Sequence, residues 1–329
     1  MGIRTGLNFS SNCSFHQSQL NISQQANKAI FVLHKKLSSY KTLSISVVID
    51  LFEKFIVPIL NYGSESWGFH DAPDIEKVQL RFYKRILGVK GTTQNDFIYG
   101  ILGRVPMLII RHCNIVKYWT NIILGKKSAY VNLLYTSMLQ TIDNRNNNNW
   151  AHNVRNLLCS NGFGDIWRDQ CVFDQEGFNK AFKQRLFDIF KQNWSFRLSE
   201  STRASFYRVI IGTHAFQNIL DTVNANRHRI ALTRLICSSH RLSIETGRWR
   251  RPQIPRHERK CAICHKLGDE FHFLLECQVH NENRIKFIKP YYRRNPSMFK
   301  CIQLLTSTNK KELRNLAKYV YLCFQTNST

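Results

Sequence analysis

Apolar residues recur every three or four positions along most of this chain, the spacing that gathers them on one face of an α-helix. Between residues 20 and 37 they include Ala26, Ile30, Leu33 and Leu37, and the lysines lie off that face. Similar patterns predict helices near residues 44–60, 74–87, 94–102, 106–124, 128–141, 150–161, 175–195, 202–221 and 225–240. We therefore expect a mainly α fold, an array of helices joined by short loops.

Proline and polar tracts mark where the predicted helices end. Pro58 should kink or end the helix over residues 44–60, because proline lacks the N–H group that a helix needs and clashes with the preceding turn. Residues 61–68 predict a turn, and Pro73 favours the start of the next helix. The asparagine-rich tract 144–149 is the best candidate for a linker.

These breaks divide the chain into segments of different expected structure. The residues up to Phe15 are typical of a short strand and turn. The predicted segments are an N-terminal strand over 1–18, a helical bundle over 19–142, a linker over 143–149, a helical connector over 150–250, a metal-binding segment over 251–300 and a C-terminal helix over 301–329. No repeat of fixed period and no heptad run is present, so the pattern indicates neither a solenoid nor a coiled coil.

The charge balance points to a polyanionic partner. The chain carries 47 Lys and Arg against 22 Asp and Glu, a formal net charge of +25. Residues 225–300 alone carry 17 basic and 6 acidic side chains, a net of +11. Such an excess repels itself in a compact state, and nucleic acid is the leading partner because phosphates neutralise it. A basic protein without such a partner is the alternative; a membrane fits less well, since no lipidation signal or long uncharged apolar run is present.

One predicted helix carries a row of cations. Lys77, Arg81, Lys84 and Arg85 are spaced three to four residues apart, so they share one face of the helix that ends near Leu87. A face that only meets solvent and a face that follows a phosphate backbone both fit this row.

The cysteines do not form the pattern of a disulfide-rich secreted protein. The sequence has 10 cysteines, and most of them lie far apart within apolar or helical patterns. The N-terminal residues lack the apolar core of a signal peptide. Free or metal-bound thiols in a reducing compartment, nuclear or cytoplasmic, are therefore expected.

A cluster of cysteine and histidine near the C-terminus has the spacing of a metal site. Cys261 and Cys264 are two residues apart, and His272 and Cys277 follow at short distance. Three thiolates and one imidazole suit a tetrahedral zinc ion, and four protein ligands leave no place for an activated water, so a structural zinc is predicted. His265 and His280 are alternative ligands, and a redox or merely buried cysteine pair is the alternative to zinc.

Basic and aromatic residues surround this cluster. Guanidinium groups bind phosphates and aromatic rings stack on unpaired bases, so these residues favour single-stranded or structured nucleic acid. The candidate contacts here are Arg241, Arg248, Trp249, Arg250, Arg251, Arg259 and Lys260. The alternative for Trp249 is that it packs against the zinc unit for its apolar area.

Several motifs in this order resemble the C-terminal part of LINE-type (non-LTR) retrotransposon reverse transcriptases. They are Thr5–Ser10, similar to the strand that closes the family's palm; Val57–Gly68, similar to its thumb signature; Gly103–Pro106; Ser238–Arg248; and the Cys-Cys-His-Cys cluster with Arg259 and Glu270, similar to its zinc knuckle. The resemblance spans most of the chain. It implies that residues 1–18 are a remnant of the palm and that residues 19–142 are a thumb-like domain.

The resemblance implies a parent protein that copies RNA into DNA, with the fingers and most of the palm upstream of Met1. The family holds its catalytic magnesium with a Tyr-X-Asp-Asp motif, and this sequence contains no Asp-Asp pair. We therefore expect a fragment that binds RNA or DNA and is inactive alone as a polymerase, with zinc as its only metal. A helical scaffold that binds another protein through a zinc-stapled tail is the alternative.

Overall fold

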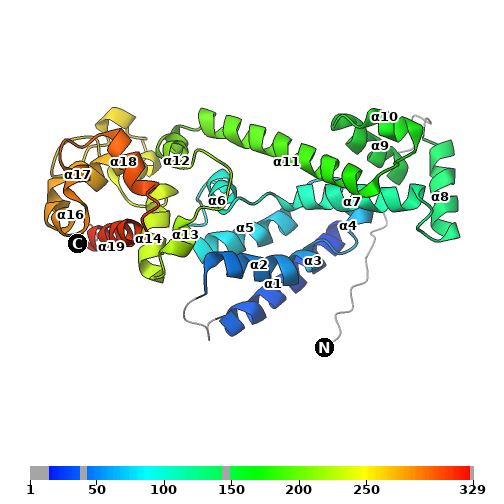
Figure 1. Cartoon of the computed structure of the whole chain (residues 1–329), viewed down its shortest axis with the longest axis horizontal. Coiled ribbons are helices and arrows are strands. Elements are labelled where there is room, and N and C mark those ends of the chain that lie inside the picture. Colours follow the sequence, from blue (N-terminus) through cyan, green and yellow to red (C-terminus); the bar gives the residue numbers. More distant parts are fainter. Residues whose placement is uncertain (1–14, 38–42, 143–148, 327–329) are drawn as a thin grey trace. The chain divides into compact units, whose positions relative to one another are not determined.

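The computed structural model describes residues 15–37, 43–142 and 149–326, and in these ranges the chain is mostly helical (Figure 1). The described β-structure consists of two isolated bridges. The α-helices are α1(His16–Leu37), α2(Ile45–Phe55), α3(Val57–Leu60), α4(Ser64–Trp67), α5(Pro73–Leu87), α6(Asn95–Leu102), α7(Met107–Ile123), α8(Ala129–Gln140), α9(Trp150–Ser160), α10(Gly164–Asp169), α11(Gln175–Glu200), α12(Ser205–Ile210), α13(Ile219–Thr222), α14(Asn226–Ile236), α15(Ser243–Trp249), α16(Asn281–Phe287), α17(Pro290–Arg293), α18(Met298–Leu305) and α19(Lys310–Thr326). The predicted mainly α class is confirmed.

The chain forms two compact units, each assembled from separate stretches of sequence. Unit 1 comprises Met1–Ser39, Asp50–Gln79 and Val105–Asn193, and unit 2 comprises Tyr40–Ile49, Leu80–Arg104 and Trp194–Thr329. The division predicted from the sequence used continuous segments instead. The predicted strand falls mainly on residues 1–14, outside the described part, and residues 16–18 already belong to α1.

The core of unit 1 combines aromatic rings with buried polar groups. The Trp119 indole donates to the hydroxyl of Tyr135 at 2.8 Å, and that hydroxyl donates to Gln170 at 2.6 Å, so α7, α8 and the end of α10 are linked inside the unit. The indole of Trp150 donates to the carbonyl of Glu65 at 2.7 Å. Because buried polar groups are costly unless they are paired, these bonds fix how the helices of unit 1 pack.

Pro58 acts as the sequence predicts. The apolar helix over residues 44–60 breaks at Ile56, where α2 has ended and α3 begins with Pro58 in its first turn. The following turn uses Gly63 in the left-handed conformation at φ 62°, which glycine adopts without steric cost. Trp67 is buried next, and its indole donates to the carbonyl of Tyr62 at 3.0 Å.

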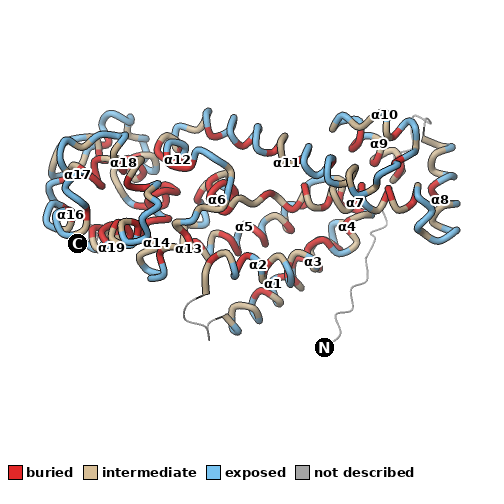
Figure 2. Tube along the Cα trace, in the orientation of Figure 1, coloured by how far each residue is buried: buried red, intermediate tan, exposed pale blue. Residues whose placement is uncertain are grey.

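Unit 2 is organised around α19, which packs against α13, α14, α16 and α18. Its buried face includes Leu316, Tyr319, Val320 and Cys323, and Figure 2 shows the buried positions of α14 and α19. The Tyr319 hydroxyl contacts the carbonyl oxygens of Phe273 and Leu274 at 3.2 and 3.0 Å. The helix therefore supports the segment that carries the cysteine and histidine cluster.

The prediction of a single helix over residues 202–221 is wrong. The chain forms α12 and α13 there, separated by residues 211–218. Gln217 donates its backbone N–H to the carbonyl of Ile101 at 3.0 Å, and Phe216 forms a bridge with Leu102. Backbone bonds to α6 thus replace the helical bonds that periodicity predicts. Other differences include α10, which lies where no helix was predicted, and α11, which runs to Glu200. The predicted C-terminal helix is also divided, into α18 and α19.

None of the helices in the described ranges combines the length and the apolar composition that a bilayer span requires.

Candidate metal centre and its basic surroundings

The first two ligand candidates lie on a tight loop closed by backbone bonds. Lys260 and Leu267 form a bridge, and Cys261 donates its N–H to the carbonyl of Lys266 at 2.7 Å. His265 takes a positive φ of 55° at the end of the turn. This loop presents the side chains of Cys261 and Cys264 on the same side, as the two-residue spacing predicts.

The other two ligand candidates are brought together by a π-turn. Asp269 accepts a hydrogen bond from the N–H of His272 at 2.8 Å and so begins the turn. Cys277 donates its N–H to the carbonyl of His272 at 2.7 Å, the bond from residue i+5 to residue i that defines a π-turn over His272–Glu276. This π-turn brings His272 and Cys277 into one cluster.

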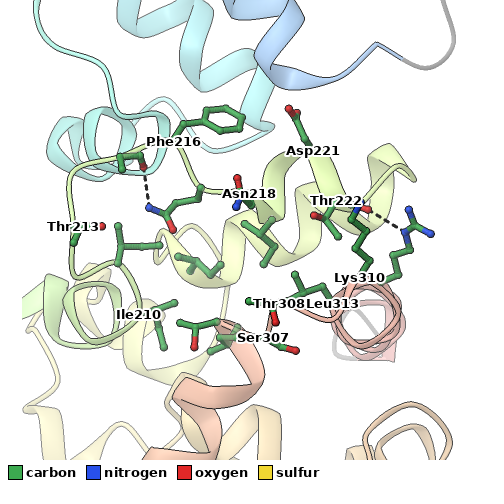
Figure 3. A pocket seen from close by; sticks show the side chains of 18 of the residues that line it. Ile210, Thr213, Phe216, Asn218, Asp221, Thr222, Ser307, Thr308, Lys310 and Leu313 are labelled. Carbon is green, nitrogen blue, oxygen red and sulfur yellow. Dashed lines mark hydrogen bonds between the residues drawn. The ribbon is translucent and has the colours of Figure 1, made fainter.

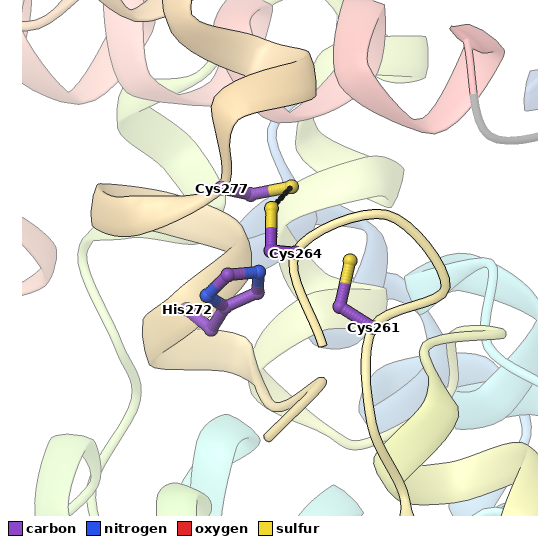
Figure 4. Close-up of side chains that lie close together, drawn as sticks. All are labelled: Cys261, Cys264, His272 and Cys277. Carbon is purple, nitrogen blue, oxygen red and sulfur yellow. Dashed lines mark hydrogen bonds between the residues drawn. The ribbon is translucent and has the colours of Figure 1, made fainter. Parts of the chain in front are cut away.

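The four predicted ligands converge. One ligand atom from each of Cys261, Cys264, His272 and Cys277 lies within 4.8 Å of the others, and Figure 4 shows the imidazole facing the three thiols. The Cys264 and Cys277 sulfurs are 3.8 Å apart. Nε2 of His272 is buried and has no hydrogen-bond partner. A buried imidazole nitrogen beside three thiols is a donor set that could hold a metal ion.

His265 and His280 do not belong to this cluster in the described part of the chain. His265 is exposed. His280 is buried and packs edge-on against Phe273, and burial next to Arg284 lowers its pKa to about 4. The structure therefore selects His272 among the three histidines that the sequence left open.

The thiols of the cluster differ in their affinity for protons. Burial raises the pKa of Cys261, but the backbone N–H groups of Cys264 and Ile263, together with the neighbouring side chains of His272 and Cys277, outweigh this effect, and the pKa falls to about 7. Burial raises the pKa of Cys277 to about 12, and the neighbouring Cys261 adds to this effect. One thiolate thus disfavours a second while no cation is bound. A metal ion would reverse this, because it binds the deprotonated form.

Hydrogen bonds from the unit 2 core hold the π-turn in place. Arg284, buried in α16, donates to the carbonyl of Leu274 at 2.9 Å and to that of Cys277 at 2.7 Å. Nδ1 of His272 lies 3.5 Å from a carboxylate oxygen of Glu276. Such a contact orients a ligating imidazole.

The segment just before the ligand loop is fixed by two buried carboxylates. Glu245 pairs with Arg203 and with Arg248, each at 2.9 Å. Glu270 accepts a hydrogen bond from Nε2 of His240 at 3.0 Å. Nδ1 of the same ring accepts a hydrogen bond from the N–H of Leu242 at 3.3 Å, so the ring proton is on Nε2. Glu245 thereby neutralises the charges of Arg203 and Arg248, and the two carboxylates together orient residues 238–248.

The structure separates the predicted nucleic-acid contacts near the metal centre into two groups. Arg259 is only 6% exposed and donates to the carbonyl oxygens of Ile254 and Ile244 at 2.8 and 3.0 Å, so it is not available to a phosphate and that prediction is corrected. Arg248 is held by Glu245. The side chains that remain exposed are those of Arg241, Trp249, Arg250, Arg251 and Lys260.

The predicted row on α5 lies on the face opposite the buried side of the helix. Lys77, Arg81 and Arg85 are exposed, and Lys77 pairs with Asp74 at 3.3 Å. Lys84 is half-buried and donates to the carbonyl of Gly91 at 2.7 Å; burial and then the charge of Arg203 lower its pKa.

Two cavities in unit 2 were not foreseen from the sequence. One, of about 520 Å³, is lined by Lys90, Arg234, Arg241 and neighbouring residues. The other, of about 800 Å³, lies between the segment 210–224 and the region of Leu305 to Arg314 (Figure 3). Its wall is mainly of hydroxyl, amide and aliphatic groups, with Asp221 as its carboxylate. The residues that line each cavity come from distant parts of the sequence, so no local sequence pattern predicts either cavity.

Comparison of the chain with protein-family models, with curated proteins and with solved structures finds no match.

Proposed function

We propose that this chain is a nucleic-acid-binding module in which a zinc ion stabilises a basic surface. The observation that carries the proposal is the combination in unit 2 of a converged Cys-Cys-His-Cys cluster with exposed cations in the segment that leads into it, Arg241, Arg250, Arg251 and Lys260. None of these four cations pairs with a carboxylate in the described ranges. Cations that stay in solvent without partners are suited to neutralise phosphates and release counterions.

Zinc is the proposed metal because the cluster matches its chemistry. Zinc–sulfur bonds of about 2.3 Å in a tetrahedron place sulfur atoms about 3.8 Å apart. The Cys264 and Cys277 sulfurs are 3.8 Å apart. Four protein donors close the coordination shell, so the ion would hold structure rather than activate water. Metal analysis of purified protein is expected to give one zinc per chain, and a chain free of stoichiometric zinc would contradict the proposal.

The motifs of the sequence support a more specific origin, the C-terminal part of a LINE-type retrotransposon reverse transcriptase. The chain would then hold element RNA, target DNA or the template–primer duplex in a nuclear or cytoplasmic compartment. Polymerase chemistry would belong to residues outside this chain, since a magnesium pair needs clustered carboxylates. Template-directed synthesis by the isolated chain would overturn this assignment.

Salt dependence of binding is the direct test. We expect fluorescence anisotropy with a labelled single-stranded oligonucleotide to show tight binding at about 50 mM salt and a steep loss by about 200 mM. The triple variant Arg250→Gln, Arg251→Gln and Lys260→Gln should weaken binding and flatten the salt dependence. Its matched control removes three exposed cations of α11, Lys183, Arg185 and Lys191, in the same way. Equal effects of the two variants, or no binding by the wild-type chain, would contradict the proposal.

An exposed apolar face supports a second candidate, a scaffold that binds another protein. Tyr130 is 81% exposed on α8, and Leu133 and Leu134 beside it are also exposed. Grouped exposed apolar residues often mark protein interfaces. Partner binding that persists at high salt and is lost in Leu133→Ser would favour this function; steep salt dependence of all binding would exclude it.

A further inference from the structure

The cavity of about 520 Å³ in unit 2 has cationic walls. Lys90 comes from the loop between α5 and α6, Arg234 from α14 and Arg241 from the loop before α15. No carboxylate is among its lining residues. Phe324 and Leu242 add apolar surface, so the cavity combines a charged wall with an apolar part.

Backbone contacts hold two of the three cations in position. Arg234 donates through Nε to the carbonyl of Gly88 at 2.6 Å, and Lys90 donates to the carbonyl of His240 at 3.2 Å. The backbone N–H of Lys90 also donates to the hydroxyl of Ser239 at 2.9 Å. The side chain of Arg241 is exposed and makes no hydrogen bond or ion pair with any described residue. Pre-positioned cations bind an anion with less loss of side-chain entropy.

The cations of the cavity repel one another. Burial lowers the pKa of Lys90, and the charges of Arg241, Arg203 and Arg234 lower it further. The nearby carboxylate Glu245, which pairs with Arg203 and Arg248, opposes this lowering of the pKa but does not cancel it. A bound anion would relieve the repulsion, since opposite charge within a few ångströms favours the charged form of a lysine.

The exposed indole of Trp249 contacts Lys90, one of the cations that line the cavity. Nζ of Lys90 is 4.1 Å from the ring centroid of Trp249, a cation–π contact that holds the ring. Trp249 is nevertheless 49% exposed. Aromatic side chains beside a basic groove are the usual platform on which unpaired bases stack.

We propose that this cavity is a binding site for single-stranded nucleic acid, in which Lys90, Arg234 and Arg241 hold a backbone phosphate and Trp249 stacks on an adjacent base. The inference rests on the proposed function and adds the strand type and the contact residues. A paired base is covered by its neighbours in the duplex, so stacking on Trp249 selects an unpaired strand.

The phosphate contact is tested with Arg241→Gln, which removes a charge without removing a described bond. Its matched control is Arg294→Gln, another exposed arginine of unit 2 whose side chain has no described partner. For an oligothymidine, Arg241→Gln should weaken binding about fivefold or more and reduce the slope of log K against log salt by about 0.7. Arg294→Gln should change neither quantity beyond error.

The stacking contact is tested with Trp249→Leu and with an abasic strand of the same length. Trp249→Leu should weaken binding of oligothymidine about tenfold, leave binding of the abasic strand unchanged, and reduce the preference for single strand over duplex. The control is Phe299→Leu, an exposed aromatic residue of unit 2 outside the cavity, which should have no effect.

The outcomes separate the two proposals. If the wild-type chain binds none of the strands, the proposed function fails and this inference fails with it. If it binds them but Arg241→Gln behaves like Arg294→Gln, only the cavity is excluded. Tripolyphosphate that binds as tightly as oligothymidine through Arg241 would show a site for free phosphate and would overturn the single-strand inference. Equal losses on the normal and abasic strands in Trp249→Leu would overturn the stacking contact.

Discussion

Individual charged residues of this chain have roles that depend on burial rather than on sequence context. Arg259 and Arg241 belong to the same basic segment, but Arg259 ties Ile244 to Ile254 from inside unit 2, and Arg241 lies in solvent. Arg111 is fully buried in unit 1 beside Trp67 and within 3.4 Å of Glu76. Only a guanidinium that is exposed to solvent can bind a phosphate. The number of basic residues in the sequence therefore overestimates the number of phosphate contacts, because buried arginines such as Arg259 and Arg111 are included in it.

The contact between Glu76 and Arg111 gives a stability prediction. Glu76 accepts hydrogen bonds from the N–H groups of Met107 and Leu108, the first residues of α7, at 3.0 and 2.8 Å. Glu76→Gln removes the negative charge next to a buried arginine, and unfolding in urea should show a loss of about 3 kcal/mol. Asp74→Asn is the control, since its pair with Lys77 is exposed and should contribute less than about 1 kcal/mol. Equal losses in the two variants would contradict the assigned role of Glu76.

The thiol pKa values predict how metal binding depends on pH. Zinc binds thiolates, so protons compete for Cys261, whose pKa is about 7, and for Cys277, whose pKa is about 12. Affinity for zinc should therefore fall as the pH is lowered from about 8 to about 6, and loading should release protons at either pH. Competition with a chromophoric chelator measures the affinity, and Cys159→Ser, an exposed thiol elsewhere, is the control. A zinc affinity that does not change with pH would argue against thiolate ligation.

At the scale of elements, local pattern predicted most helices and long-range contacts decided the exceptions. The break at Pro58 follows from the chemistry of one residue, and the ligand pair Cys261 and Cys264 follows from a two-residue spacing. The interruption over residues 211–218 could not be predicted, because it depends on backbone bonds to Ile101 and Leu102. The basic cavity could not be predicted either, since its cations come from three separate segments.

The contact between the end of α6 and residues 211–218 predicts a requirement for glycine. Gly103 has φ 62°, and a Cβ there would lie 2.5 Å from the backbone nitrogen of Phe216. Gly103→Ala should therefore cost clearly more stability than the 1–2 kcal/mol or so of a strained left-handed residue. Gly125→Ala is the matched control, because Gly125 has φ 67° and no atom within 4 Å of its Cβ position. Equal losses of thermal stability in the two variants would mean that the close approach is unimportant.

At the scale of the whole molecule, the features proposed to bind nucleic acid all belong to unit 2. The ligand cluster, the basic cavity and Trp249 lie within residues 80–104 and 194–329. Arg241 lines both the basic cavity and the smaller cavity that contains Cys261, His272 and Cys277. The metal centre and the proposed strand-binding site therefore share a wall. Unit 1 has its own buried core of α7, α8 and α9, which contains none of the four ligands.

This shared wall predicts that metal loss weakens nucleic-acid binding without unfolding unit 1. His272→Ala should abolish zinc binding, increase hydrogen exchange over residues 259–280 and weaken oligonucleotide binding, because metal binding supplies folding free energy to so small a loop. Exchange in α7 should stay slow. His272→Cys keeps four soft donors and should restore both the zinc and the affinity. If affinity stays low when zinc is restored, or never falls when zinc is lost, the metal centre does not support the basic surface.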